Sequence, residues 1–324
     1  MNRELCVYLE YLTEDLREKI RQTAEELDFI PRFFSLEEFD AARDALQHCE
    51  VLYAHSPELL RTAPASLQWY ACAFAGVDPY CKDDGIFQNP QCRLTNSNVY
   101  GVTIAEHVIM VTLMLLRQMP VYQEIMRNRG WSNQLPIRSI HGGRFTLLGT
   151  GDIGGHIAQN LQALGAKRVV GLCRSGQAEG SCWNSVLPVS ALEQVLPETD
   201  VLILALPETA ETIGLLTRER ISLLPKGAYV VNVGRGTAID QEALMDALNR
   251  QHLAGAALDV MMPEPLPRDH PLWETKHLLL TPHISGNMTL EETRRMNVER
   301  FCENLRRYAA GAPLLGLIDR SRGY

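Results

Sequence analysis

Three polar side chains in the second half of the chain could together carry out acid–base chemistry on a small acid. Arg235, Glu264 and His283 each follow an apolar run and lie in a segment rich in glycine or proline. A guanidinium group matches a carboxylate in shape and charge, and a histidine paired with a carboxylate can transfer a proton near neutral pH. Taken singly, such an arginine most often makes a surface ion pair, and such a histidine is most often structural.

A glycine-rich turn lies upstream of these residues. Residues 149–154 read GTGDIG and stand between a predicted strand, Arg144–Leu148, and a helical pattern. In a dinucleotide-binding turn, Gly149 permits the tight bend, Gly151 lets a pyrophosphate approach the backbone, and Gly154 lets the helix pack closely. The sequence therefore predicts a dinucleotide site, although methyltransferases carry similar loops and some glycine turns serve packing alone.

The end of the next predicted strand distinguishes NAD from NADP. An NAD enzyme places an Asp or Glu about 20 residues downstream to bind the ribose 2′-hydroxyl. Here Cys173 occupies that place and is followed by Arg174 and Ser175. A cation and a hydroxyl suit a 2′-phosphate, so we expect NADP to be favoured over NAD. The alternative is that Arg174 is a solvated loop residue.

The elements that must position these residues alternate between short apolar runs and helical patterns, which predicts α/β folds with parallel sheets. We expect strands at 5–9, 51–54, 67–73, 144–148, 168–173, 201–206, 228–232, 256–260 and 278–281. We expect helices near 14–28, 36–49, 102–119 and 290–310, with Pro120 ending the third, and a loop over 78–98. If the later strands are parallel, Arg235, Glu264 and His283 converge at one edge of the sheet.

Composition bounds the functions that remain. The chain has 324 residues, 46% of them hydrophobic and 22% charged, which is typical of globular proteins and excludes a disordered or polytopic membrane chain. The net charge of −8 makes it a poor binder of nucleic acid or of anionic membranes. The eight scattered cysteines form no metal-site spacing, and the N-terminus lacks the apolar core of a signal peptide, so we expect a cytoplasmic protein and no metal.

Several ordered motifs resemble those of the D-isomer-specific 2-hydroxyacid dehydrogenase family. They lie at residues 98–106, 149–154, 206–212, 232–244, 264–267, 270–273 and 281–283, with a weaker match at 75–78. The resemblance implies a Rossmann-type doubly wound cofactor domain, residues 100–286, inserted into a smaller flavodoxin-like α/β substrate domain, residues 1–99 plus 287–324. It also implies a homodimer.

The resemblance implies a reaction in which NAD(P)H transfers a hydride to a small 2-oxo acid, or a D-2-hydroxy acid returns it to NAD(P). It also implies roles for individual residues. Arg235 would hold the substrate carboxylate, helped by the backbone at Ala75 and Gly76. His283 would donate the proton, and Glu264 would orient its ring and favour the charged form. The residues expected at the cofactor, besides those already named, are Asp152, Ile153, Leu206, Pro207, Thr209, Val233, Gly234, Asp259 and Gly286.

Two matters stay open at this level. A dinucleotide-sensing protein without turnover, like the family's corepressors, would keep the same fold. The substrate side chain is also undetermined, because the N-terminal part carries no recognisable specificity motif. Glu264 disfavours formate, since formate dehydrogenases of the family carry Gln at that place.

Overall fold

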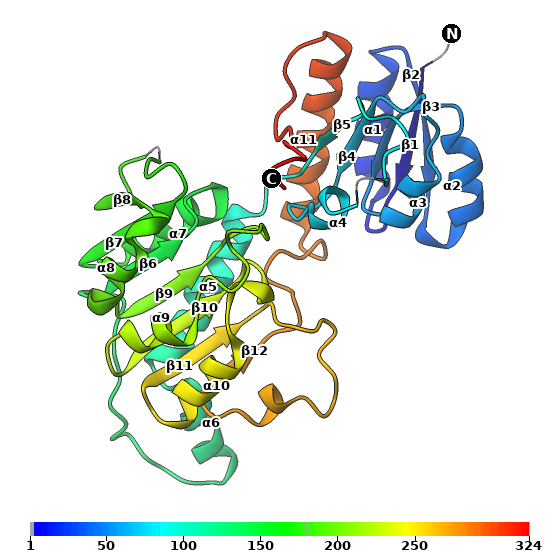
Figure 1. Cartoon of the computed structure of the whole chain (residues 1–324). Coiled ribbons are helices and arrows are strands. Elements are labelled where there is room, and N and C mark those ends of the chain that lie inside the picture. Colours follow the sequence, from blue (N-terminus) through cyan, green and yellow to red (C-terminus); the bar gives the residue numbers. More distant parts are fainter. Residues whose placement is uncertain (1–2, 84, 179, 324) are drawn as a thin grey trace. The chain divides into compact units, whose positions relative to one another are not determined.

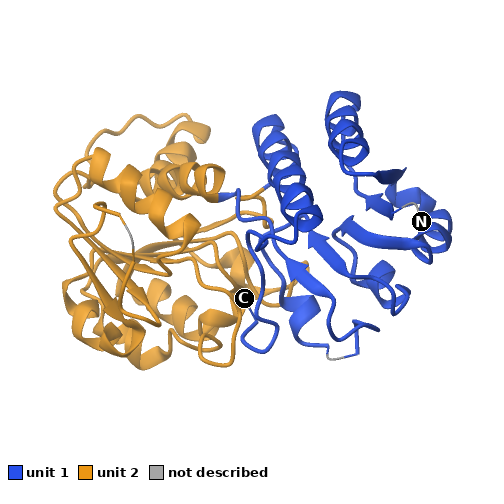
Figure 2. Cartoon of the chain, turned by 90° about the horizontal axis from the view of Figure 1, so that it is seen from above, with its two compact units in different colours: residues 1–100, 287–324 blue, residues 101–286 orange. Residues whose placement is uncertain are grey.

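The computed structural model describes residues 3–83, 85–178 and 180–323, and these divide into two compact units. Unit 1 comprises residues 1–100 and 287–324, and unit 2 comprises residues 101–286 (Figure 2). Unit 2 is thus inserted into the sequence of unit 1, with crossings after Tyr100 and after Gly286.

Unit 1 is built on a parallel five-stranded sheet in the order β2-β1-β3-β4-β5 (Figure 1). This is the flavodoxin-like order. Its strands are β1 (Arg3–Tyr8), β2 (Phe29–Phe34), β3 (Cys49–Ala54), β4 (Trp69–Cys72) and β5 (Arg93–Thr95).

Side chains of these strands alternate between two apolar layers, as the period of two in a strand requires. Leu5 and Val7 face a layer that includes residues of α1 (Glu14–Glu25) and α11 (Glu291–Ala309), whereas Cys6 and Tyr8 face the opposite layer. That opposite layer includes residues of α2 (Phe39–Leu46), α3 (Pro57–Arg61) and α4 (Asp78–Cys81). Helices therefore cover both faces of the sheet.

Unit 2 is built on a parallel seven-stranded sheet in the order β12-β11-β10-β9-β6-β7-β8. Counted from β6, the strands follow the Rossmann order 3-2-1-4-5-6 with one more strand added. They are β6 (Arg144–Leu148), β7 (Arg168–Cys173), β8 (Ser185–Pro188), β9 (Val201–Leu204), β10 (Ala228–Asn232), β11 (Leu253–Leu258) and β12 (Leu278–Leu280). The order of the strands changes direction at β6: β7 and β8 lie on one side of it, and β9 to β12 lie on the other. Ligands of such sheets bind between β6 and β9, at the carboxyl ends of the strands.

Two layers of helices cover this sheet (Figure 1). On one face, α5 (Gly101–Leu116) packs on α7 (Asp152–Ala163) and on β10 and β11. The apolar core on the other face includes residues of α8 (Leu192–Val195), α9 (Arg218–Leu223) and α10 (Gln241–Asn249). A further helix, α6 (Met119–Arg127), follows α5. Both sheets confirm the predicted α/β class.

The predicted elements were wrong in four places. Pro120 does not end a helix but lies in the first turn of α6, where proline is tolerated because its missing N–H would have no partner there. The break comes at Gln118, which adopts a left-handed conformation with φ of 52°. The strands β2, β5 and β8 were missed, and β5 and α4 lie in the segment predicted as a loop.

The described residues also bear on membranes and metals. Among them, no single helix is long and apolar enough to cross a bilayer, and only the bent pair α5 and α6 passes that test when taken together. The same residues contain no group of three or more His, Cys, Asp or Glu side chains that could hold a metal ion. All eight cysteines are free thiols.

Candidate active site

The turn between β6 and α7 has the geometry that the glycine pattern predicts. Gly149 has a φ of +104°, which favours glycine, and a Cβ there would lie 2.5 Å from the Ala205 carbonyl oxygen. A Cβ on Gly154 would lie 2.0 Å from the Gly149 carbonyl oxygen, so only glycine lets α7 begin this close to the strand. A Cβ on Gly151, by contrast, would meet nothing within 4 Å. The turn is therefore tightly packed at Gly149 and Gly154 and has free space beside Gly151. This arrangement fits a pyrophosphate bound at the N-terminus of α7.

The end of β7 lies beside this turn. The Cys173 thiol is within 3.4 Å of the Ser175 hydroxyl and 3.3 Å of the Gln177 carbonyl oxygen. Burial alone would raise the pKa of Cys173, but hydrogen bonds from the Ser175 and Thr150 side chains lower it. Arg174 is exposed, and its charge contributes to lowering the pKa of Glu211, although the Thr209 hydroxyl is the main cause. This strand end therefore presents a cation and two hydrogen-bonding side chains, without a carboxylate.

The loops after β9 and β10 continue the same edge of the sheet. A Cβ on Gly234 would lie 2.7 Å from both the N and O atoms of Leu206, so the two loops touch through their backbones. Leu206 and Val233 are buried. The β9 loop is closed internally, because the Thr212 hydroxyl donates to the Pro207 carbonyl oxygen at 2.7 Å and accepts from the Thr209 N–H at 2.8 Å. The loop thus has a defined shape where the predicted cofactor residues lie.

Arg235 is presented by a turn that a buried asparagine organises. The Asn232 side chain accepts from the Gly234 N–H at 3.0 Å and donates to the Arg235 carbonyl oxygen at 2.9 Å. The guanidinium group is partly exposed and donates to the Gly234 carbonyl oxygen at 2.7 Å. A Cβ on Gly236 would lie 2.3 Å from the Met261 carbonyl carbon, so this turn packs directly on the β11 loop.

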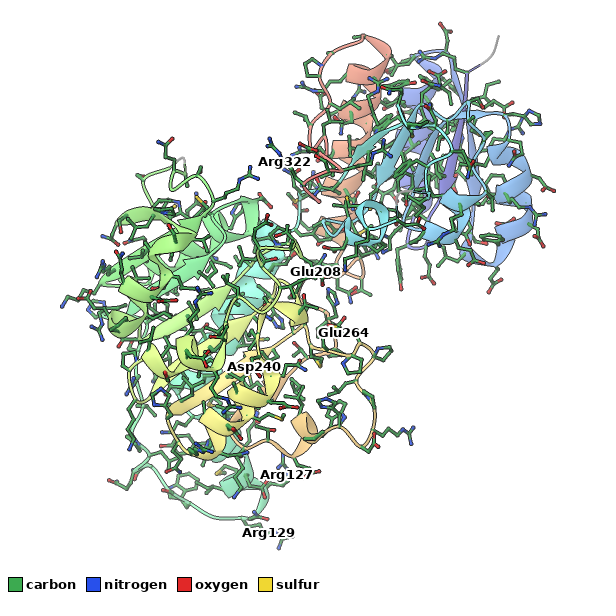
Figure 3. The ribbon with its side chains drawn as sticks, in the orientation of Figure 1. Arg127, Arg129, Glu208, Asp240, Glu264 and Arg322 are labelled. Carbon is green, nitrogen blue, oxygen red and sulfur yellow. The ribbon has the colours of Figure 1, made fainter. Side chains whose placement is uncertain are left out.

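Glu264 and His283 form a pair across the loops after β11 and β12. Nδ1 of His283 lies 2.8 Å from Oε2 of Glu264, while Oε1 of Glu264 accepts from the Met261 N–H at 2.9 Å. The carboxylate is therefore oriented by its own loop and in turn orients the imidazole, leaving Nε2 as the ring nitrogen available for chemistry. Figure 3 shows Glu264 with Glu208, from the loop after β9, on the same edge of unit 2.

Asp259 holds the segment that carries His283. Its buried carboxylate accepts from the Thr281 hydroxyl at 2.6 Å and from the N–H groups of Ile284 and Ser285 at 2.9 Å each. Burial would raise the pKa of Asp259, but hydrogen bonds from the Ser285 and Thr281 side chains and from this backbone lower it. Asp259 is thus placed to position residues 281–285, and its expected contact with the nicotinamide stays a prediction.

Sequence reasoning assigned no role to the residues that brace this edge. Asn232 and Thr281 lie inside the motifs, and Ser285 lies two residues after the last one, but none of the three carried a role. His107 of α5 reaches Thr281, with 3.4 Å between Nε2 and the hydroxyl oxygen. Burial lowers the pKa of His107, although the charge of Asp259 opposes the shift. The available signal was the presence of small polar residues at the ends of otherwise apolar strands.

In unit 1, the segment after β4 carries Ala75 and Gly76, the two residues expected to bind substrate through their backbones. The Ala75 carbonyl oxygen accepts from the Asn96 side chain at 3.0 Å. Within the described residues, the N–H groups of Ala75 and Gly76 donate to no protein atom. Gly286, also expected near the cofactor, is the last residue of unit 2.

Comparison with known proteins bears on this arrangement. Residues 109–285 match the sequence model of the D-isomer specific 2-hydroxyacid dehydrogenase NAD-binding domain. The chain is 31% identical over 238 residues to glyoxylate/hydroxypyruvate reductase A of Salmonella newport, covering 72% of this chain and 73% of that protein.

Solved structures agree over nearly the whole chain. One is a D-isomer specific 2-hydroxyacid dehydrogenase family protein of Aeromonas salmonicida, with a TM-score of 0.83 and 33% identity over 99% of this chain and 100% of that one. Another, from Xanthobacter autotrophicus, was crystallised with NADPH and MES and has a TM-score of 0.83 and 28% identity over 99% of both chains. With its two parallel sheets and its matching motifs, this chain is an NAD(P)-type oxidoreductase and belongs to the D-isomer-specific 2-hydroxyacid dehydrogenase family.

Proposed function

We propose that the protein reduces a small 2-oxo acid to the D-2-hydroxy acid, and catalyses the reverse reaction, with NADP(H) as the preferred cofactor. The observation that carries the proposal is the 2.8 Å contact between His283 Nδ1 and Glu264 Oε2, at the edge of the sheet where the glycine turn also lies. A histidine backed by an oriented carboxylate is the standard arrangement for a general acid–base group.

His283 transfers the proton. In reduction, its Nε2 donates to the 2-oxo oxygen, and Glu264 stabilises the charged ring before the transfer. In oxidation, neutral His283 accepts the proton of the 2-hydroxyl group at the same atom. The hydride would come from a reduced nicotinamide cofactor in reduction and would pass to the oxidised cofactor in the reverse reaction. In this proposal the same atom, Nε2 of His283, donates the proton in reduction and accepts it in oxidation.

Arg235 anchors the substrate carboxylate. Its side chain leaves a turn fixed by Asn232, and a guanidinium group forms two parallel hydrogen bonds with a carboxylate. The N–H groups of Ala75 and Gly76 are the second donor set in this proposal, supported by their lack of any acceptor within the described part of the chain. Paired donors on a carboxylate fix the orientation of carbon 2 for attack.

NADP preference rests on the end of β7. A carboxylate there would accept from a ribose diol and repel a 2′-phosphate, whereas Cys173, Arg174 and Ser175 present no acidic group. Arg174 is exposed and can form a charge-assisted bond with a phosphate. The Xanthobacter relative crystallised with NADPH supports the same preference. The remaining cofactor residues, at 149–154, 206–209, 233–234, 259 and 286, would contact the pyrophosphate and nicotinamide portions.

A second copy of the chain is the proposed protein partner. The segment that follows α5 exposes large apolar side chains, including Trp131 at 88% exposure, Met126 at 55% and Ile137 at 49%. An exposed apolar segment of this kind is typical of an interaction surface. Light scattering of the purified protein should give a dimer mass, and Trp131→Ser should shift it towards the monomer. A monomeric parent would contradict this part of the proposal.

The decisive experiment is an assay of cofactor oxidation with a panel of substrates. Glyoxylate, hydroxypyruvate, pyruvate and a longer 2-oxo acid are each combined with NADPH and with NADH. We expect turnover with at least one small acid and a higher kcat/KM for NADPH. NADPH binding without turnover of any acid would contradict the proposal and favour a dinucleotide sensor.

A further inference from the structure

The loop that carries Glu264 has little packing to fix it. It follows β11, and residues 262–265 are all exposed. Met261 is buried and packs on the turn at Gly236, so the closely packed part of the loop ends at that residue. The two prolines of the exposed segment have no N–H group and cannot donate a backbone hydrogen bond. The position of the Glu264 carboxylate therefore depends on the few contacts that this loop makes.

A single side chain from α10 holds the backbone of the loop. The Met262 N–H donates to Oε1 of Gln241 at 2.8 Å, and Nε2 of Gln241 donates to the Met262 carbonyl oxygen at 2.6 Å. One carboxamide thus pairs with both backbone groups of one residue, because it offers an acceptor and a donor side by side. The Met262 side chain is 48% exposed, so these backbone contacts contribute more to its position than side-chain packing does.

Gln241 is the first residue of α10, and the start of this helix is anchored in the core of unit 2. The Asp240 N–H donates to the Leu216 carbonyl oxygen at 3.1 Å, and the Asp240 carboxylate caps the helix by accepting from the Ala243 N–H at 2.9 Å. Ala243 and Leu244 are buried. The Gln241 side chain therefore connects an exposed loop to a fixed point.

Met262 lies within the turn that orients the Glu264 carboxylate. The residue before it, Met261, donates its N–H to Oε1 of Glu264 at 2.9 Å, and Oε2 of the same carboxylate lies 2.8 Å from Nδ1 of His283. A movement of Met262 would change the path of the chain between that N–H donor and the carboxylate. The direction in which Oε2 faces His283 would change with it, and small displacements of a reacting group lower rates strongly.

We propose that Gln241 is a positioning residue for the proton transfer, because it fixes the loop after β11 so that the Glu264 carboxylate meets Nδ1 of His283. This inference rests on the proposed function, in which His283 exchanges the proton. Gln241 contacts neither substrate nor cofactor in this role, and its effect on the reaction passes through Glu264. All of these residues belong to unit 2.

Two substitutions at this position remove the contacts in steps. Gln241→Met keeps nearly the length of the side chain and forms neither hydrogen bond, whereas Gln241→Glu keeps the acceptor for the Met262 N–H and loses the donor. With NADPH and the 2-oxo acid that the parent reduces best, we expect kcat to fall about three- to tenfold in Gln241→Met and less in Gln241→Glu. The KM for NADPH should stay the same in both. Glu242→Met, at the exposed next position of α10, is the matched control and should behave like the parent.

A double-mutant cycle tests whether the effect passes through Glu264. Gln241→Met is made in the parent and in Glu264→Ala, and the two fold-changes in kcat are compared. If Gln241 acts by placing the carboxylate, its loss changes little once the carboxylate is gone. In the parent background, Gln241→Met should also raise the solvent deuterium isotope effect on kcat, because proton transfer then limits the rate to a greater extent.

The outcomes distinguish this inference from the function beneath it. A parent enzyme that reduces none of the 2-oxo acids contradicts the proposed function itself. An active parent whose kcat is unchanged in Gln241→Met overturns the role of Gln241 and leaves the proposed function intact. The same holds if Gln241→Met lowers kcat by the same factor in the parent and in Glu264→Ala, since the effect would then not pass through the carboxylate.

Discussion

Both units end their parallel strands in a polar edge, but the two edges are built differently. In unit 2, loops held by backbone contacts and by short side chains present Arg235, Glu264 and His283 outwards. In unit 1, the corresponding edge contains buried hydroxyl groups that bond to one another and to His55. The edge of unit 2 presents charged side chains on loops, whereas the edge of unit 1 holds its polar groups in buried contacts with one another. We therefore expect changes at Arg235 and His283 of unit 2 to affect the rate, changes at the end of β7 to affect the choice of cofactor, and changes in unit 1 to affect substrate selectivity or stability.

The largest effect is expected from His283→Ala. Loss of the proton donor should lower kcat by about a hundredfold to ten-thousandfold, while NADPH still binds. Stopped-flow turnover and a fluorescence titration with NADPH measure the two quantities. His277→Ala is the matched control, because His277 has a φ of 60° against 54° for His283 and lies at the other end of β12. Near-normal turnover of His283→Ala would remove the basis for calling unit 2 the catalytic edge.

Arg235→Lys should have the next largest effect. Lysine keeps the positive charge but lacks the planar pair of donors, so we expect kcat/KM to fall by roughly a hundredfold. Steady-state kinetics with glyoxylate measures the change. Arg250→Lys, an exposed position after α10, should behave like the parent. Equal kinetics for the parent and Arg235→Lys would show that another group anchors the carboxylate.

A smaller effect is expected at the end of β7. Cys173→Asp introduces a carboxylate that repels a 2′-phosphate and can accept from a ribose diol, so the preference should move towards NADH by roughly ten- to hundredfold. The ratio of kcat/KM for NADPH to that for NADH measures it. Cys173→Ser, which adds no charge, should move the ratio much less. A parent that already prefers NADH would contradict the role given to Arg174.

The smallest effect is expected from Tyr53→Phe in unit 1, and it should lower the free energy of unfolding. The buried Tyr53 hydroxyl donates to Asn297 Oδ1 at 2.7 Å, and the same Asn297 donates to the Tyr100 hydroxyl at 2.9 Å. Tyr53→Phe leaves a buried acceptor with one partner fewer, which should cost about 1–3 kcal/mol in the free energy of unfolding. Urea unfolding followed by circular dichroism measures it. Tyr122→Phe, on the half-buried side of α6, should cost much less. A large fall in kcat with an unchanged free energy of unfolding in Tyr53→Phe would contradict the distinction between the units.

The same contrast explains how much could be predicted from the sequence. Strands β6, β7 and β10 were predicted to the residue, because each is a short apolar run next to a recognisable turn. Strand β2 contains Pro31 and Arg32 and pairs on one side only, so neither its composition nor its pattern indicated a strand. Strands β5 and β8 read RLT and SVLP, and these short segments include polar residues or proline, so they do not stand out as apolar runs.

The candidate site divides in the same way. The glycine roles could be predicted because a left-handed turn and a close helix approach each require a residue without a Cβ. The hydroxyl chain from Tyr70 to His55 could not, because its members come from three separate segments whose meeting depends on tertiary packing. Asp259 illustrates an intermediate case: the resemblance implied a place for it near the cofactor, but its three hydrogen bonds to residues 281–285 were visible only in the structure.

The left-handed backbone at His283 also limits which residues this chain can carry at that position. With φ at 54°, the position disfavours most side chains, and β-branched ones above all, whereas asparagine, aspartate and histidine tolerate it best. Of those three, only histidine and aspartate can exchange a proton, and only histidine does so near neutral pH without special surroundings. The conformation of this one residue therefore narrows the side chains that position 283 can carry. Among the side chains that it tolerates, histidine is the one suited to the proposed proton transfer.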